Sequence, residues 1–189
     1  AGLTRSAATP VSLVDGRPAY GGSPNDASVV RAIQDLKARG FRVLLYPFIL
    51  MDIPKGNTLP DPYSDDASSG GQAVHPWRGR ITLSPAIGYA GTPDRSAAAA
   101  GQVAAFLGAA SAADFGWDGS AVNFGGASDD WGFRRFILHL ATLADAAGGV
   151  DAFAIGSEMV AMTSARSAAD VFPFVDGLVD LAAEARSIL

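Results

Sequence analysis

The chain has 189 residues, of which 49% are hydrophobic and 17% are charged, a composition typical of a globular protein and not of a disordered one. Its net charge is −5 and its Lys and Arg residues are scattered, which argues against nucleic acid as a partner because phosphate binding needs clustered basic residues. Cysteine is absent, so disulfides and thiolate chemistry are excluded, and no apolar run is long enough to predict membrane insertion.

The first elements predict the order strand, helix, strand. Pro10–Asp15 is a short apolar segment that ends in Asp-Gly, as strands often do. A Ser-Pro pair then predicts a helix over Pro24–Arg39, and Gly40 supplies its end. Phe41–Leu50 follows as a continuous apolar strand, a pattern typical of parallel sheets that are covered on both faces.

The rest of the chain alternates irregular segments with helices. Asp52–Thr92 is a long loop rich in Pro, Gly, Asp and Ser, and loops of this length are usually functional or disordered. Within it, Trp77–Leu83 is a candidate short strand. Another irregular insertion is expected at Gly108–Ser128. Apolar periodicity and end signals predict the remaining elements: helix Pro93–Leu107, helix Asp129–Ala147, strand Val150–Ser157 and helix Ser167–Leu189.

This alternation predicts an α/β fold with a parallel sheet and right-handed crossovers. Three strands would leave unpaired edges, so we expect a partial (β/α)8 TIM-barrel-like fold, with residues 1–189 forming a single segment of a longer protein. A small open doubly wound sheet is the alternative. No glycine-rich nucleotide motif is present and the two histidines, His75 and His139, are far apart, so we predict neither a cofactor nor a metal site.

In parallel barrels the functional groups lie at the C-terminal ends of the strands. Glu158 follows the apolar strand that ends at Ser157, and it is one of only two glutamates in the chain. A carboxyl group at a barrel mouth can protonate a leaving glycosidic oxygen. Glu158 is therefore the candidate catalytic residue. The alternative is that it caps the next helix or pairs with Arg166, whereas the other glutamate, Glu184, needs only a solvent-facing position on a helix.

Two aspartates follow the other predicted strands. Asp52 either lines the same mouth or forms a turn beside Pro54. Asp15 precedes Gly16, and a plain turn is favoured there over a role in substrate binding.

Trp77, Arg78 and Arg80 are candidates for substrate binding within the long loop. An aromatic face beside guanidinium groups suits sugar rings with hydroxyl or acidic substituents. Equally, Trp77 could anchor the loop while the arginines pair with nearby carboxylates, for which the candidates are Asp61, Asp65 and Asp66.

Four motifs carry a resemblance to a known family: Tyr46–Pro54, Asn57–Tyr63, Pro76–Thr82 and Ile155–Glu158. Together they resemble the TIM-barrel-like domain of the large tail protein of gene transfer agents, which are phage-like particles of alphaproteobacteria. That protein is described as a host-specificity or baseplate-hub protein. Its domain is in turn similar to TIM-barrel glycoside hydrolases.

The resemblance implies that Glu158 occupies the acid/base position at the end of the fourth strand. Ser157 stands where such enzymes commonly have Asn, so it replaces the residue that binds the substrate 2-hydroxyl. On this mapping the chain holds about strands two to four, and the nucleophile, which belongs to the seventh strand, lies outside it. The fragment alone is then expected to be inactive as a hydrolase.

The resemblance also implies a location and partners: the virion tail of a phage-like particle, assembled in the bacterial cytoplasm. The partners would be the remainder of the parent tail protein, other baseplate subunits, and a cell-surface polysaccharide or peptidoglycan. Three functions fit: a barrel that hydrolyses this glycan during host attachment, a carbohydrate-binding barrel that is catalytically inactive, and a purely structural barrel of the baseplate.

Overall fold

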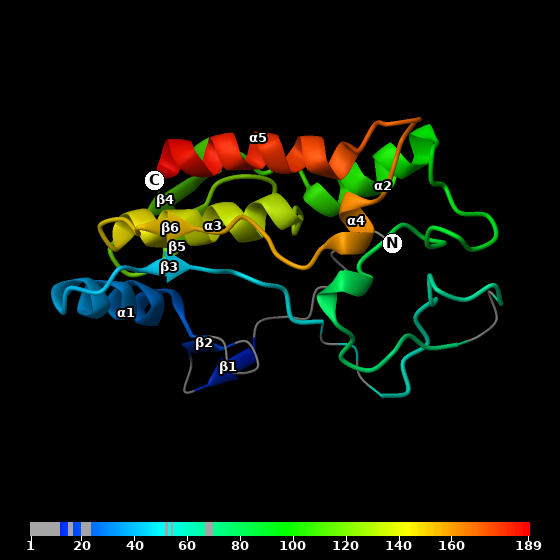
Figure 1. Cartoon of the computed structure of the whole chain (residues 1–189). Coiled ribbons are helices and arrows are strands. Elements are labelled where there is room, and N and C mark those ends of the chain that lie inside the picture. Colours follow the sequence, from blue (N-terminus) through cyan, green and yellow to red (C-terminus); the bar gives the residue numbers. More distant parts are fainter. Residues whose placement is uncertain (1–11, 15–16, 20–23, 52, 54, 67–69) are drawn as a thin grey trace. The chain divides into compact units, whose positions relative to one another are not determined.

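The computed structural model describes residues 12–14, 17–19, 24–51, 53, 55–66 and 70–189 (Figure 1). The chain divides into two compact units. The first unit contains Phe48–Leu107 and Gly156–Asp180, and the second contains Leu3–Pro47, Gly108–Ile155 and Leu181–Leu189. Each unit therefore combines segments that are far apart in the sequence.

The helices and strands are short and belong mostly to one unit each. In the second unit they are β1 (Ser12–Val14), β2 (Arg17–Ala19), α1 (Asp26–Ala38), β3 (Leu44–Leu45), η3 (Ala112–Asp114), β4 (Phe115–Trp117), β5 (Val122–Phe124), α3 (Phe133–Ala146) and β6 (Ala152–Phe153). In the first unit they are η2 (Arg78–Arg80), α2 (Ala97–Leu107) and α4 (Val160–Thr163), while α5 (Pro173–Ile188) contributes residues to both.

The two strands β3 and β6 form the parallel pair of the fold (Figure 1). Leu44 pairs with Ala152 and Leu45 with Phe153. The Asp151 carboxylate extends the contact beyond the ladder, because its Oδ2 accepts the Val43 backbone N–H at 2.7 Å. The predicted strands Phe41–Leu50 and Val150–Ser157 are thus neighbours and parallel, but the ladder covers only two residues of each. Within the described residues there is no closed barrel.

The predicted first strand, Pro10–Asp15, does not join this pair. Its described part, β1, pairs antiparallel with β2, so that Ser12 lies opposite Ala19 and Val14 opposite Arg17. The expectation of a parallel strand here was wrong. The reason is local: the Asp-Gly dipeptide after Val14 is a strong hairpin signal, and a short hairpin closes with far less chain than a crossover does.

A second hairpin, β4–β5, occupies a segment that was expected to be irregular. Phe115 lies opposite Phe124 and Trp117 opposite Val122. The Asp118 side chain closes the turn by accepting N–H groups of Ser120 at 2.8 Å and Ala121 at 2.9 Å. These hydrogen bonds lower the pKa of Asp118 to about 2, the bond from Ala121 having the largest effect. The alternation of aromatic residues around Asp-Gly was the sequence signal for this hairpin.

Helix α1 begins two residues later than predicted. Asn25 is its N-cap, and the Asn25 side chain accepts the Ser28 N–H at 2.9 Å. At its other end Lys37 contacts the carbonyl of Gly148 and that of Gly149, the latter at 2.8 Å. These carbonyls lie just beyond the C-terminus of α3, where the positive charge of Lys37 also interacts favourably with the helix dipole.

The core of the second unit forms between α1, α3 and the β3 segment. Apolar residues at helical spacing on each helix face one another there, as the periodicity predicts. The buried members are Val30, Ile33, Val43, Leu143 and Ala147.

Helix α3 is shorter than the predicted Asp129–Ala147, because Asp130 ends the preceding segment. The Asp130 carboxylate accepts the backbone N–H of Gly132 at 2.9 Å and that of Ala109 at 2.7 Å. On α3 itself, Arg134 forms an ion pair with Glu184 of α5, and Glu184 also accepts the Ala112 N–H at 2.7 Å. Glu184 was expected to need only solvent; instead it joins α3, α5 and η3.

In the first unit, α2 and α5 also start later than predicted, at Ala97 and Pro173. Pro173 at the first helical position is a favoured start, and its missing N–H costs nothing there. Phe174 is fully buried and meets Phe106 of α2 edge to face, with ring centroids 5.8 Å apart. This aromatic contact anchors the start of α5 on α2. Among the described helices, none is long and apolar enough to cross a membrane.

Candidate functional site

Glu158 lies in an irregular segment of the first unit, just before α4. Its backbone has φ +54°, the left-handed region that residues other than glycine seldom adopt. Residues held in this region by their surroundings are enriched at functional sites. The next residues, Met159 and Met162, are buried, so the segment is anchored on one side while the glutamate side chain remains 48% exposed.

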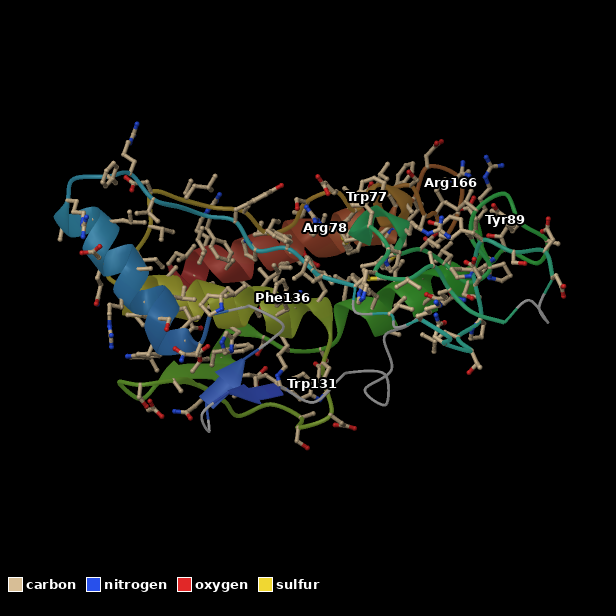
Figure 2. The ribbon with its side chains drawn as sticks, turned by 90° about the horizontal axis from the view of Figure 1, so that it is seen from below. Trp77, Arg78, Tyr89, Trp131, Phe136 and Arg166 are labelled. Atoms are coloured by element: carbon tan, nitrogen blue, oxygen red, sulfur yellow. The ribbon has the colours of Figure 1, made fainter. Side chains whose placement is uncertain are left out.

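Two donors from the long loop hold one carboxylate oxygen of Glu158. The Trp77 indole Nε1 donates to Oε2 at 2.6 Å, and an Arg78 guanidinium nitrogen lies 2.8 Å from the same oxygen. Figure 2 shows Trp77 and Arg78 side by side at the start of η2. Among the described residues, the other oxygen, Oε1, has no hydrogen-bond partner. The sequence-predicted residues Trp77, Arg78 and Glu158 therefore form one cluster, which we call the Trp77 cluster.

The short helix η2 sets the orientation of Trp77. Its backbone is closed by bonds from the Arg80 N–H to the Trp77 carbonyl at 2.9 Å and from the Ile81 N–H to the Arg78 carbonyl at 3.0 Å. The indole ring covers Gly79, where a Cβ atom would lie 2.4 Å from ring carbons. Trp77–Leu83 thus contains the 3-10 turn η2 and not the strand considered from sequence, and η2 contacts α4.

Arg78 and Trp77 differ in their access to solvent. The Arg78 side chain is only 15% exposed, and its guanidinium group lies 4.6 Å from the centroid of the Phe48 ring. Trp77 is 54% exposed. The surface of the cluster is therefore an indole ring beside a carboxylate oxygen, with the guanidinium group beneath.

Arg80 belongs to a separate set of contacts. Its guanidinium group lies 4.1 Å from the centroid of the Tyr63 ring and 3.6 Å from the Asp61 carboxylate. The Tyr63 hydroxyl donates to the Arg80 carbonyl at 3.1 Å, and burial raises the pKa of Tyr63. Asp61 is one of the three partners, with Asp65 and Asp66, that the loop-anchor alternative considered for the arginines. The tight contacts fix the loop around Tyr63.

The remaining candidates do not join the cluster. Asp15 and Asp52 lie outside the described residues. Ser157 precedes Glu158, and its hydroxyl oxygen is buried with no hydrogen-bond partner among the described residues. Arg166, considered as a partner for Glu158, instead pairs with Asp94 at 2.5 Å.

The Asp94–Arg166 pair was not anticipated from sequence. The Asp94 side chain is 7% exposed and accepts both the Arg166 guanidinium and, at 2.9 Å, its backbone N–H. Burial raises the pKa of Asp94, but these hydrogen bonds outweigh it and hold the pKa below its ordinary value. The Thr-Pro-Asp turn before α2 was the available sequence signal for Asp94, although no sequence pattern identified Arg166 as its partner.

Arg135 of α3 was also missed. Its guanidinium group lies between the rings of Phe124, at 3.9 Å, and Trp131, at 4.1 Å. It donates to the Asp130 carbonyl at 2.8 Å, which ties it to the turn before α3. This stack fixes the β5 end of the hairpin against α3 in the second unit.

The described structure is a mixed α/β fold with a parallel strand pair. Residues 131–189, which include Glu158, match the family model of the GTA TIM-barrel-like domain, where GTA stands for gene transfer agent. The match confirms the predicted resemblance for this part, which is less than a third of the chain. It links the chain to gene transfer agents and to a TIM-barrel-like domain. No curated protein matches the chain.

Proposed function

We propose that the chain belongs to the tail of a gene transfer agent particle, where the Trp77 cluster binds a cell-surface glycan without cleaving it. The family match over residues 131–189 supports the association with such particles. The tail location and the glycan are inferences from the resemblance and from the chemistry of the cluster.

The observation that carries the binding role is the exposed indole ring of Trp77. The ring is 54% exposed, although a hydrogen bond to Glu158 and the contact with Gly79 hold it in place. A fixed aromatic face stacks on the C–H face of a sugar with little loss of conformational entropy. The free Oε1 of Glu158 beside it is an acceptor for a sugar hydroxyl.

The contacts of Glu158 favour binding over catalysis. A general acid has to donate a proton to the leaving oxygen. Here Oε2 already accepts from both Trp77 and Arg78, so only Oε1 could carry the proton. The carboxylate therefore serves as an acceptor that orients these two side chains.

Glycoside hydrolysis in the complete barrel is the second candidate. The left-handed backbone of Glu158 favours it, because strain of this kind is concentrated at active sites. This function needs a second carboxylate about 5–9.5 Å from Glu158, which the resemblance assigns to a strand outside this chain.

Titration of the 189-residue chain with peptidoglycan fragments and capsular polysaccharide, followed by calorimetry, tests the proposal. We expect binding that Trp77→Ala weakens about tenfold, or about 1.4 kcal/mol, because the stacking surface is lost. Trp131→Ala is the matched control, since Trp131 is also exposed, at 41%, but belongs to the second unit.

Two results would contradict the binding role. Equal affinities of the two tryptophan variants would move the site away from Trp77, and no binding of any glycan would remove the function. Release of reducing ends by the complete barrel, abolished there by Glu158→Gln, would instead establish the hydrolase candidate.

A further inference from the structure

The Trp77 cluster offers an incoming ligand an anionic acceptor and no accessible cation. Glu158 is 48% exposed and has Oε1 free of partners among the described residues, whereas Arg78 is 15% exposed and paired. Arg80, the next basic residue, lies over the Tyr63 ring and beside Asp61. A ligand at Trp77 therefore meets an indole face and a carboxylate oxygen.

The first unit, which contains the cluster, carries a net negative charge, the same sign as the Glu158 carboxylate. The first unit contains five Lys and Arg residues and nine Asp and Glu residues, so its net charge is −4 of the total −5. Three of its four arginines are closely paired: Arg78 with Glu158, Arg80 with Asp61 and Arg166 with Asp94. The fourth, Arg95, lies 4.0 Å from the same Asp94 carboxylate and is largely exposed. A negative unit repels anionic ligands and attracts cationic ones over roughly a Debye length, about 8 Å at physiological salt.

We infer that the cluster selects a sugar that carries a protonated amino group, that is, a hexosamine unit with a free amine. An ammonium group over an indole face gains a cation–π interaction when it lies within about 6 Å of the ring. The same group can form an ion pair with Oε1 of Glu158. This inference rests on the proposed glycan binding, and it differs from the sequence-based expectation of acidic substituents.

The pairing of Glu158 with Arg78 limits the size of the effect. The guanidinium group lies 2.8 Å from Oε2 and partly neutralises the carboxylate. An exposed ion pair and an exposed cation–π contact each contribute only a modest free energy of binding. We therefore expect a preference of about tenfold for the amine over the matched neutral sugar.

The experiment compares three β-1,4-linked tetrasaccharides of equal length on the unmodified chain: tetraglucosamine, tetra-N-acetylglucosamine and cellotetraose. Calorimetry is run at low salt in mildly acidic buffer, so that the sugar amines are protonated. Tetraglucosamine is expected to bind about tenfold more tightly than the two neutral sugars, and added salt should reduce the difference.

Two variants test whether Glu158 causes the preference for the amino sugar. Glu158→Gln keeps an acceptor for the Trp77 N–H but removes the charge, so it should bind the three sugars equally. Asp176→Asn is the matched control, because it removes an exposed carboxylate of the same unit outside the cluster, and it should keep the tenfold preference. Circular dichroism verifies that both variants fold, and the comparison on the unmodified chain does not depend on them.

The outcomes separate this inference from the proposed function. Equal binding of all three sugars to the unmodified chain overturns the inference and leaves glycan binding intact. A preference that survives Glu158→Gln also overturns it, because another group would then hold the amine. Absence of binding by all three sugars overturns the inference, and absence of binding to peptidoglycan fragments and capsular polysaccharide as well contradicts both.

Discussion

Trp77 keeps its orientation because Gly79 has no side chain. The indole ring lies over the glycine and its Nε1 reaches Glu158, so a single position in η2 determines whether the ring faces the carboxylate. Arg78 depends on the same turn, because it follows Trp77 directly and reaches the same oxygen. The candidate site is thus controlled by the geometry of one three-residue helix.

Gly79→Ala should displace the Trp77 ring. The new Cβ would lie 2.4 Å from ring carbons, which forces the ring or the turn to move. We expect a destabilisation of about 1–3 kcal/mol, typical of overpacking, and loss of the indole N–H hydrogen bond. Chemical denaturation measures the first effect, and the NMR shift of the Trp77 indole proton measures the second.

Gly101→Ala is the control for this substitution. Gly101 is in α2 with nothing within 4 Å of an added Cβ, and alanine there should stabilise the helix by about 0.5–1 kcal/mol. An unchanged indole shift in Gly79→Ala would show that Trp77 does not depend on the glycine.

At the scale of elements, side chains that accept backbone N–H groups decide where helices and turns begin. Asn25 starts α1, Asp130 ends the segment before α3, and Asp118 closes the β4–β5 turn. Each replaces a hydrogen bond that the backbone cannot make at an element boundary. At α1 and α3 these acceptors set the first residue of the helix later than the sequence predicted.

The β4–β5 turn should become less stable in acid. The pKa of Asp118 falls from an ordinary 3.8 to about 2 in the folded chain. A depressed pKa means that the stabilising contribution is present above the ordinary value and is lost as the pH falls through the folded value. Amide exchange of Ser120 and Ala121 should therefore speed up, relative to the rest of the chain, between pH 3.8 and about 2.

In Asp118→Ala the amides of Ser120 and Ala121 should exchange fast at all pH values, because the carboxylate that accepts their N–H groups is absent. Asp129→Ala, on an exposed aspartate of another turn, should leave the exchange of Ser120 and Ala121 unchanged. Equal protection of these amides with and without Asp118 would rule out the side chain as the group that closes the turn.

At the scale of the whole molecule, each unit joins segments that the sequence separates. The contact of Asp94 with Arg166 spans 72 positions within the first unit, and that of Lys37 with the end of α3 spans more than 100 within the second. Polar side chains thus complete connections that the short parallel ladder does not make.

Asp94→Asn should destabilise the first unit by about 1–3 kcal/mol, because it removes the negative charge that pairs with the partly exposed guanidinium group of Arg166. The pKa of Asp94 is held below 3.8, so this contribution is present above pH 3.8 and is lost as the pH falls through the folded value. Urea unfolding at several pH values should show a larger loss in acid for the unmodified chain than for the variant.

Asp35→Asn is the control, because Asp35 forms an exposed pair with Arg39 on α1 and should cost no more than about 1 kcal/mol. Similar costs for the two substitutions would contradict the role of the Asp94 pair.

The sequence by itself determined helices α1, α2, α3 and α5 but not the short α4. It also indicated the two parallel strands and the candidate residues Trp77, Arg78 and Glu158, because apolar periodicity and rare residue types are local signals. It also predicted the resemblance that the family match supports over residues 131–189. The segment from Phe115 to Phe124 also carried a sequence signal for the hairpin β4–β5, although the hairpin was not predicted.

The tertiary structure alone decided which carboxylate each arginine meets: Glu158 for Arg78, Asp94 for Arg166 and Glu184 for Arg134. Nineteen acidic residues offer many partners of equal charge, and only packing selects among them.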